Sequence, residues 1–180
     1  DPGAGSAVTP KDEASIRFGI EQGVEYIALS FVGGPSDIEN YREIIRAHSG
    51  TQKVIAKIER AIALESLDAV IAAADAVMVA RGDLGAEVPL EQIPFIQERI
   101  IRAATAAGKP VITATHMLLS RVRESAPTRA EVTDVANAVL QGSDAVMLSE
   151  ETTVGAHPVE AVTMTEKILL DAEKHMPEDR

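Results

Sequence analysis

Lys57 and Glu59 stand two residues apart where the apolar run that begins at Val54 comes to its end. Side chains i and i+2 of a strand lie on one face, so we expect this ammonium and this carboxylate to point the same way. A lysine so placed suits an oxyanion or a phosphoryl oxygen. A structural lysine–glutamate ion pair is the alternative interpretation of the same two residues.

Asp83 is a second carboxylate, and it follows the next apolar run within "ARGDLG" (80–85). Two carboxylates without a histidine or cysteine cluster suit Mg²⁺ or Mn²⁺, which takes water or substrate oxygens at its remaining positions. The two glycines permit a tight turn and leave backbone amides accessible at the start of a short helix, where a carboxylate or phosphate could bind. An ordinary strand-to-helix turn is the alternative.

Thr115 and Ser149 carry hydroxyl groups at the ends of two later apolar runs. Hydroxyls in these places can relay protons, although single hydroxyls there more often belong to turns or helix caps. His116 is a candidate base or ligand beside Thr115.

The elements that must position these residues are short apolar strands that alternate with amphipathic helices. We expect strands over 24–32, 53–59, 75–83, 109–117 and 143–151. We expect helices over 10–23, 35–50, 64–74, 90–108, 128–142 and 157–175. Thr128 and Glu131 have the spacing of a capping box, which marks the start of the helix over 128–142.

Nearly continuous apolar strands that alternate with helices indicate a parallel sheet covered on both faces. Each strand ends in polar residues, and such ends converge on one mouth in a (β/α)₈ barrel. A doubly wound sheet is the competing architecture, but no G-x-G-x-x-G follows any strand. We therefore expect an α/β fold of the (β/α)₈ TIM-barrel type, partial, with about five βα units in a single domain over residues 1–180.

The composition limits the classes of partner. The 180 residues are 46% hydrophobic and 25% charged, with a net charge of −11. This acidic balance argues against a general nucleic-acid binder or a binder of anionic membranes, since no basic excess is available. There is no cysteine, and no apolar run approaches the ~20 residues of a membrane helix. We expect a cytoplasmic protein.

Taken together, the motifs closely resemble pyruvate kinase. The stretches that carry the resemblance are "VIAKIER", "VMVARGDLGAEVPLEQIPFIQERII", "GKPVITATHML", "PTRAEVTDVANAVLQGSDAVMLSEET" and "HPVEAV". The opening "AVTPKDEASIRFGIEQGVEYIALSFV" resembles the fourth-strand region of the same family. The resemblance covers nearly the whole chain in unbroken order and implies the second part of a barrel, strands four to eight.

The resemblance implies catalytic roles for three residues. Lys57 is similar to the lysine that stabilises the phosphoryl group during its transfer. Thr115 is similar to the threonine that lies near the enolate carbon of the substrate. Ser149 resembles a serine of the network that delivers the proton.

The resemblance also implies binding roles. Glu59 and Asp83 are similar to the two carboxylates that hold the divalent ion, Mg²⁺ or Mn²⁺, which bridges enzyme and substrate. Ala80, Arg81 and Gly82 resemble the backbone segment around the substrate carboxylate. Asp83 and Thr115 then also belong to the substrate site.

The chain departs from the family pattern at several positions. His116 stands where glutamine is usual, and Glu150 replaces a glycine beside Ser149. "LSR" (119–121) replaces a segment like "ESM" or "DSM" and so lacks its acidic residue. The 180 residues hold no counterpart of the family's first three strands, with their K⁺ ligands and phosphate-binding arginine, or of its lid and C-terminal domains.

By this resemblance the parent reaction is phosphoryl transfer from phosphoenolpyruvate to ADP, which gives pyruvate and ATP in glycolysis. We expect the isolated chain to be weakly active or inactive, because phosphoryl transfer depends on positioning and electrostatics. A metal-dependent lyase or decarboxylase acting on pyruvate-like 2-oxo acids is one alternative, and a non-catalytic fragment or degenerate copy is another. Five strands cannot close a barrel of eight, so we expect a homo-oligomer or a complementing chain.

Overall fold

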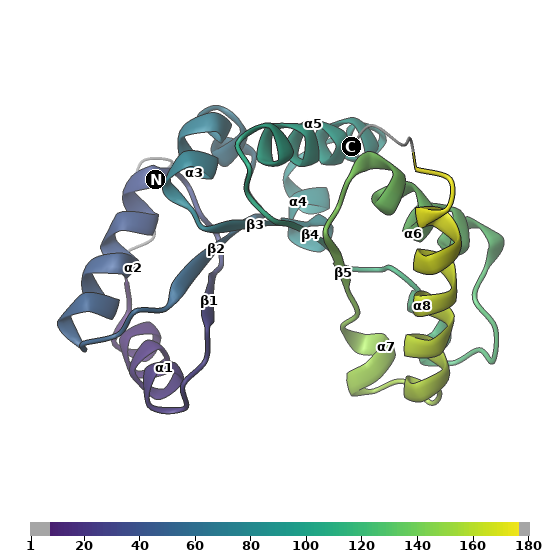
Figure 1. Cartoon of the computed structure of the whole chain (residues 1–180), viewed down its shortest axis with the longest axis horizontal. Coiled ribbons are helices and arrows are strands. Elements are labelled where there is room, and N and C mark those ends of the chain that lie inside the picture. Colours follow the sequence, from purple (N-terminus) through teal and green to yellow (C-terminus); the bar gives the residue numbers. More distant parts are fainter. Residues whose placement is uncertain (1–7, 177–180) are drawn as a thin grey trace. The chain divides into compact units, whose positions relative to one another are not determined.

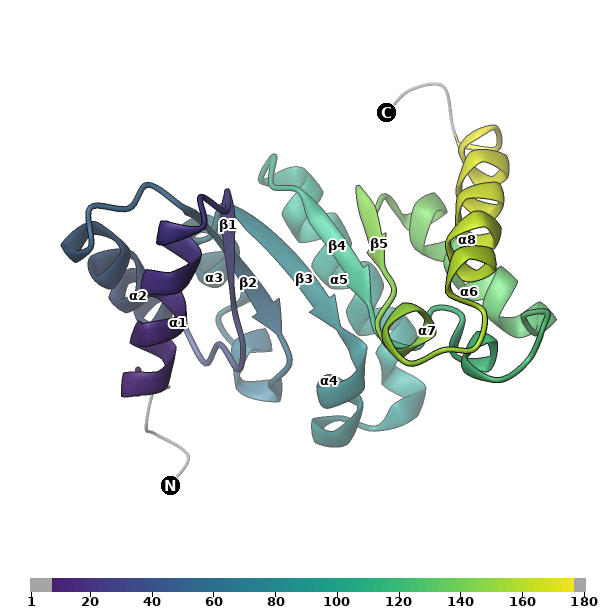
Figure 2. The same ribbon diagram turned by 90° about the horizontal axis from the view of Figure 1, so that it is seen from below.

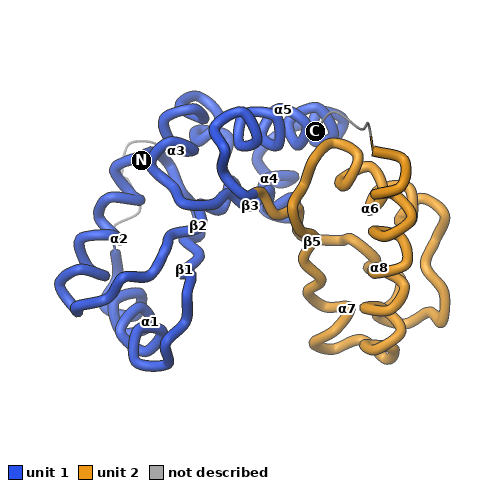
Figure 3. Tube along the Cα trace, viewed as in Figure 1, with its two compact units in different colours: residues 1–110 blue, residues 111–180 orange. Residues whose placement is uncertain are grey.

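The structure is a computed structural model that describes residues 8–176 of the chain. The chain divides into two compact units, residues 1–110 and residues 111–180, drawn in blue and orange in Figure 3. Each unit has its own strands, helices and buried core, and each is described by itself.

Three parallel strands form the centre of the first unit (Figure 1). They are β1 (Tyr26–Leu29), β2 (Lys53–Ile58) and β3 (Ala76–Ala80). β1 pairs with β2 so that Leu29 lies opposite Ala56, and β2 pairs with β3 so that Ile58 lies opposite Val79. All of β3 is buried, whereas burial alternates along β2.

The helices of the first unit lie along one face of these strands and beyond their carboxyl ends. They are α1 (Pro10–Glu21), α2 (Pro35–Ala47), α3 (Leu67–Ala73), α4 (Arg81–Glu87) and α5 (Ile93–Ala106), with 3₁₀ turns η1 (Ala61–Leu64) and η2 (Leu90–Gln92). α3 packs between α2 and α5, and Figure 1 shows the three helices along the strands. Figure 2 shows α4 just beyond the carboxyl end of β3.

The second unit contains two parallel strands, β4 (Val111–Ala114) and β5 (Ala145–Met147). Its helices are α6 (Arg129–Gln141), α7 (Glu150–Thr153) and α8 (Pro158–Glu173), with the 3₁₀ turn η3 (Leu119–Val122). α6 and α8 pack against each other, and their core holds Met117, Leu118, Val135, Ala138 and Ile168.

Local signals explain where α6 begins and ends. The Thr128 side chain accepts from the backbone N–H of Glu131, and the Glu131 carboxylate accepts from the Thr128 N–H, which completes the predicted capping box. Gly142 ends the helix at φ 107°, a left-handed conformation that glycine adopts without steric cost.

The predicted α/β class and the alternation of parallel strands with helices are confirmed. Four of the five strands end three or four residues earlier than predicted. Those expected over 24–32 and 109–117 stop at Leu29 and Ala114. The strand expected over 75–83 stops at Ala80, because α4 begins at Arg81 with Leu84 fully buried beneath it. The strand expected over 143–151 stops at Met147, and Glu150 begins α7.

The expectation of strands buried on both faces is wrong for β1 and β5. Tyr26 and Ala28 on β1 are exposed, and so are Ala145 and Met147 on β5. In each unit the helices run along one face of these strands, which leaves the other face open (Figure 1). Among residues 8–176, no helix combines the length and apolar composition needed to cross a membrane.

Candidate functional site

Lys57 and Glu59 form an ion pair at the carboxyl end of β2. The Lys57 Nζ lies 2.6 Å from Oε1 of Glu59, so the predicted shared face is observed. The Glu59 side chain is only 1% exposed, whereas that of Lys57 is 23% exposed. The pair therefore places a buried negative charge behind a positive charge that solvent can reach.

The burial pattern of β2 explains how this pair arises. Val54, Ala56 and Ile58 are completely buried, while Lys57 lies on the opposite, partly open face. Burial of these three apolar side chains fixes the strand's orientation, since a slip of one residue would turn them all outward. The same burial therefore directs Lys57 toward the open face.

The end of β1 supplies two further contacts to the pair. The Ser30 hydroxyl accepts a hydrogen bond from Lys57 Nζ at 2.8 Å. The backbone N–H of Phe31 donates to Oε2 of Glu59 at 2.6 Å. Phe31 has φ 55°, a left-handed conformation that is rare and strained for an aromatic residue. Such strain is typical of residues that a functional site holds in place.

The segment Ala80–Asp83 lies at the junction of β3 and α4. Ala80 is the last, buried residue of β3, and the Arg81 Nη1 donates to Oε1 of the buried Gln97 at 3.3 Å. Gly82 and Asp83 are exposed in the first turn of α4. Asp83 is thus a carboxylate that solvent can reach, in contrast to Glu59.

Glu87, for which no role was predicted, connects α4 to the residues that follow β2. Its Oε2 accepts from the backbone N–H of Ala61 at 2.7 Å, and its Oε1 lies 4.0 Å from Nε of Arg60. A carboxylate in the last turn of a helix opposes the helix dipole, and this was the available signal that Glu87 has another role.

The chemistry of the donors fits a hard divalent cation. Glu59 and Asp83 offer carboxylate oxygens, which Mg²⁺ and Mn²⁺ prefer. Each Glu59 oxygen already accepts one contact, and a carboxylate has about four lone-pair sites, so acceptor capacity remains. Within residues 8–176 no three His, Asp or Glu side chains come together as a metal cluster. Water or substrate oxygens would therefore have to complete the coordination.

Thr115 and Ser149 belong to the second unit. Thr115 and His116 follow β4 with φ values of 76° and 54°, two successive residues in the left-handed region. This is costly for a β-branched residue such as Thr115. Ser149 does not end a strand as expected, and instead precedes α7.

Glu151, for which no role was predicted either, accepts hydrogen bonds from two backbone N–H groups near Thr115 and Ser149. It is 1% exposed, and its Oε1 accepts from the Leu118 N–H at 3.1 Å while its Oε2 accepts from the Ser149 N–H at 2.8 Å. Its neighbour Glu150 is exposed. The two adjacent carboxylates therefore have opposite environments, which the sequence could not distinguish.

The segment 119–121, which departs from the family pattern, forms η3. Arg121 is 2% exposed, donates from Nη1 to the carbonyl of Glu124 at 3.2 Å, and leaves its Nε without a hydrogen-bond partner. A buried guanidinium therefore stands where the resemblance implies an apolar residue.

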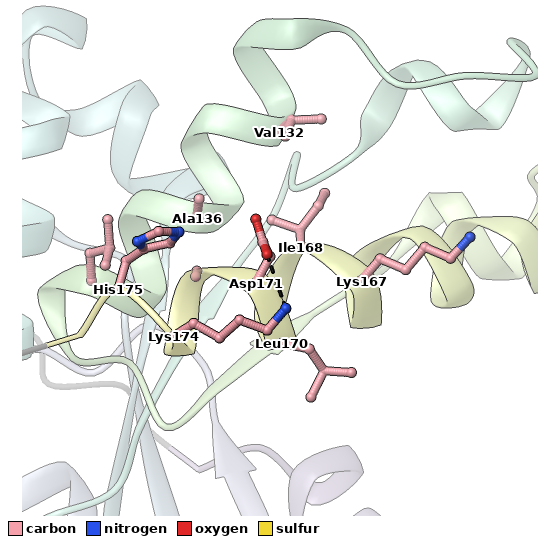
Figure 4. A pocket seen from close by; sticks show the side chains of 10 residues that line it. Val132, Ala136, Lys167, Ile168, Leu170, Asp171, Lys174 and His175 are labelled. Atoms are coloured by element: carbon pink, nitrogen blue, oxygen red, sulfur yellow. Dashed lines mark hydrogen bonds and ion pairs between the residues drawn. The ribbon is translucent and has the colours of Figure 1, made fainter.

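A cavity of about 590 Å³ opens between α6 and α8 (Figure 4). Val132, Ala136 and Ile168 form its apolar wall, and Lys174 pairs with Asp171 at its rim. None of the predicted site residues lines it, so this cavity is separate from the candidate catalytic groups of its unit.

Comparisons with known proteins identify the family of the chain. Residues 4–162 match the family described as pyruvate kinase, barrel domain. The chain is 51% identical over 169 residues to pyruvate kinase of Thermococcus litoralis, which covers 94% of the chain and 36% of the relative. It is 52% identical to pyruvate kinase 2 of Synechocystis sp. (90% of the chain, 27% of the relative). It is 51% identical to pyruvate kinase of Geobacillus stearothermophilus (93% and 29%).

The chain thus spans about a third of the length of the relatives it matches. The predicted partial (β/α)₈ type, with five parallel strands and their helices among residues 8–176, is the architecture that this match describes. The chain belongs to the pyruvate kinase barrel domain family.

Proposed function

We propose that this chain carries the phosphoryl-transfer lysine and the divalent-metal ligands of a pyruvate kinase. The Lys57–Glu59 ion pair supports this most directly. It places a solvent-accessible ammonium group beside a buried carboxylate at the carboxyl end of β2. The overall reaction would move the phosphoryl group of phosphoenolpyruvate to ADP, giving ATP and the enolate of pyruvate. The enolate carbon then takes a proton to give pyruvate.

Lys57 would donate hydrogen bonds to the phosphoryl oxygens while negative charge builds on them during transfer. Glu59 and Asp83 would hold Mg²⁺ or Mn²⁺, which when bound neutralises charge on the substrate's oxygens. Ala80, Arg81 and Gly82 would lie along the substrate carboxylate. We assign all of these roles to the first unit.

Thr115 would lie near the carbon that is protonated, and Ser149 would belong to the network that delivers the proton. The buried Glu151, which binds the backbone beside Ser149, supports a fixed position for that hydroxyl. K⁺ would act in the reaction as well, through ligands that lie largely outside these 180 residues.

We also propose that residues 1–180 form one partial barrel domain, found in the cytoplasm, that is completed by a second copy or by a complementing chain. The exposed residues of β1 and β5 support this, since edge strands with apolar side chains recruit partners. Pairing of such edges would satisfy the backbone N–H and C=O groups that each edge strand leaves unpaired.

Mn²⁺ titration by calorimetry tests the metal site. Asp83→Asn should weaken Mn²⁺ binding at least tenfold, because a solvent-exposed ligand is lost without disturbing the core. Glu43→Gln, an exposed carboxylate on α2, is the matched control and should leave the affinity unchanged. Equal affinity in the two variants would remove the proposed site.

A coupled assay with phosphoenolpyruvate, ADP, Mg²⁺ and K⁺ tests the activity. We expect turnover far below the ~1–10³ per second of ordinary enzymes. Omission of ADP should abolish the turnover. Product formed from oxaloacetate without ADP would instead favour the lyase alternative.

A further inference from the structure

Ser30 is the residue next to β1 whose side chain contacts the candidate phosphoryl-transfer group. The pairing of β1 with β2 places Leu29 opposite Ala56, so the next position along each strand sets Ser30 opposite Lys57. The Ser30 Oγ then accepts from Lys57 Nζ at 2.8 Å, across 27 residues of chain. The register of β1 and β2 therefore places the Ser30 hydroxyl within hydrogen-bond distance of the Lys57 ammonium group.

The hydrogen-bond capacity of Lys57 gives this contact its significance. An ammonium group has three N–H donors. Oε1 of Glu59 takes one at 2.6 Å and the Ser30 hydroxyl takes another. Within residues 8–176, no other group accepts from Nζ, and the side chain is 23% exposed. Two fixed acceptors on a tetrahedral nitrogen also fix the direction of the third N–H.

The type of residue at position 30 suits this task. A second carboxylate would add negative charge beside Lys57 and oppose the approach of an anion. A hydroxyl is neutral, so it orients the ammonium group without cancelling its charge. A small residue without an acceptor would let the lysine's four-carbon chain change its rotamer.

Phe31 extends the same support to Glu59. Its N–H donates to Oε2 of Glu59 at 2.6 Å, and Phe31 itself holds a strained φ of 55°. Consecutive residues after β1 thus hold both members of the ion pair, one through a side chain and one through the backbone.

We propose that Ser30 is a positioning residue, which holds Lys57 so that its remaining N–H is presented to a phosphoryl oxygen of the bound substrate. This inference rests on the proposed function and names how that site selects a phosphorylated ligand. Among the described residues the Ser30 hydroxyl bonds directly to Lys57 and not to a proposed metal ligand, so its removal should act first on the phosphoryl group that Lys57 would hold.

The test compares two ligands that differ by the phosphoryl group, phosphoenolpyruvate and pyruvate. Their affinities for the chain are measured at saturating Mg²⁺ by ligand-observed NMR, with the ³¹P signal for phosphoenolpyruvate and the methyl protons for pyruvate. Ser30→Ala should weaken phosphoenolpyruvate binding about tenfold, as expected for one lost charged hydrogen bond, and change pyruvate binding less than twofold. Ser30→Thr keeps the hydroxyl and should restore most of the affinity.

Ser36→Ala, which removes an exposed hydroxyl on α2, is the control and should change neither affinity. Unchanged phosphoenolpyruvate binding in Ser30→Ala, or an equal loss for both ligands, would overturn the role of Ser30. If the unaltered chain bound Mn²⁺ in calorimetry but neither ligand, or bound no metal, the proposed function itself would fail and this inference with it.

Discussion

Asp75 and Asp144 make the same pair of hydrogen bonds, each to a valine in the strand that precedes it. The Asp75 carboxylate accepts from the Val54 N–H at 2.8 Å, and the Asp75 N–H donates to the Val54 carbonyl at 3.0 Å. Asp144 does the same with Val111, at 2.8 and 2.9 Å. The tetrapeptide Asp-Ala-Val-Met, which occurs at both places, thus begins a strand and ties it to its neighbour.

Replacement of these two aspartates should have unequal effects. Asp144→Ala should lower the free energy of unfolding by about 1.5–3 kcal/mol, the value for a hydrogen bond to a charged group. Asp75→Ala should cost roughly 1 kcal/mol more, because the Asp75 carboxylate also pairs with Arg42 at 2.8 Å. Urea unfolding measures both values. An equal or smaller loss for Asp75→Ala would show that the pair with Arg42 adds nothing.

Removal of Lys57 alone should destabilise the chain more than removal of the whole ion pair. Lys57→Met leaves the buried Glu59 carboxylate without a counter-charge, and we expect a loss of about 3 kcal/mol, the lower end for buried pairs. The double variant Lys57→Met/Glu59→Gln should recover most of this loss, since no buried charge then remains. The exposed Lys11→Met is the control in urea unfolding. Two variants of equal stability would mean that solvent already screens Glu59.

The stability of the second unit should depend on the ionisation of Glu131. Burial raises the pKa of Glu131, but hydrogen bonds from Ser120 and Thr128 outweigh this effect and hold the pKa below its usual value. Its contribution is therefore complete above the unfolded-state pKa of about 4.3 and is lost as the pH falls through the lower, folded-state value.

Thermal unfolding between pH 7 and pH 2 tests this dependence. Glu131→Gln should lower Tm at pH 7, and the difference from the unaltered chain should shrink as the pH falls below about 4. Glu166→Gln, an exposed carboxylate on α8, should show no such trend. A constant difference at all pH values would contradict the role of the Glu131 charge.

The exposed strands predict association of the isolated chain. Tyr26 on β1 is 42% exposed and Met147 on β5 is 38% exposed. Light scattering at low micromolar concentration should give a mass above the 19.1 kDa of one chain. Tyr26→Lys and Met147→Lys should lower that mass, because charge on an edge strand opposes pairing. A monodisperse monomer before any substitution would contradict the prediction.

Local rules in the sequence were sufficient for the strands and the longer helices, whereas the short helix α7 was not predicted. The capping box of Thr128 and Glu131 involves neighbours three residues apart, so its geometry depends little on the rest of the chain. The alternation along β2 likewise fixed that Lys57 and Glu59 share a face. The order and class of the elements followed from the same periodicities.

Strand ends were less predictable, because an apolar run does not specify where its backbone changes conformation. The run that ends in "ARGDLG" (80–85) is compatible with a longer strand or with a strand followed by a helix. Burial of Leu84 in the first unit selected the helix from Arg81 onward. Asp83 therefore lies in an exposed helical turn and not at the end of a strand, where it was predicted.

The partners of the site residues were decided only by the tertiary structure. Ser30 reaches Lys57 across 27 residues, and Glu151 reaches the Leu118 amide across 33. Such contacts depend on strand register and on the packing of distant segments, which no local pattern encodes. For this reason residue types and spacing could predict which side chains can do chemistry, whereas the fold selects which hydroxyl and which backbone groups hold them.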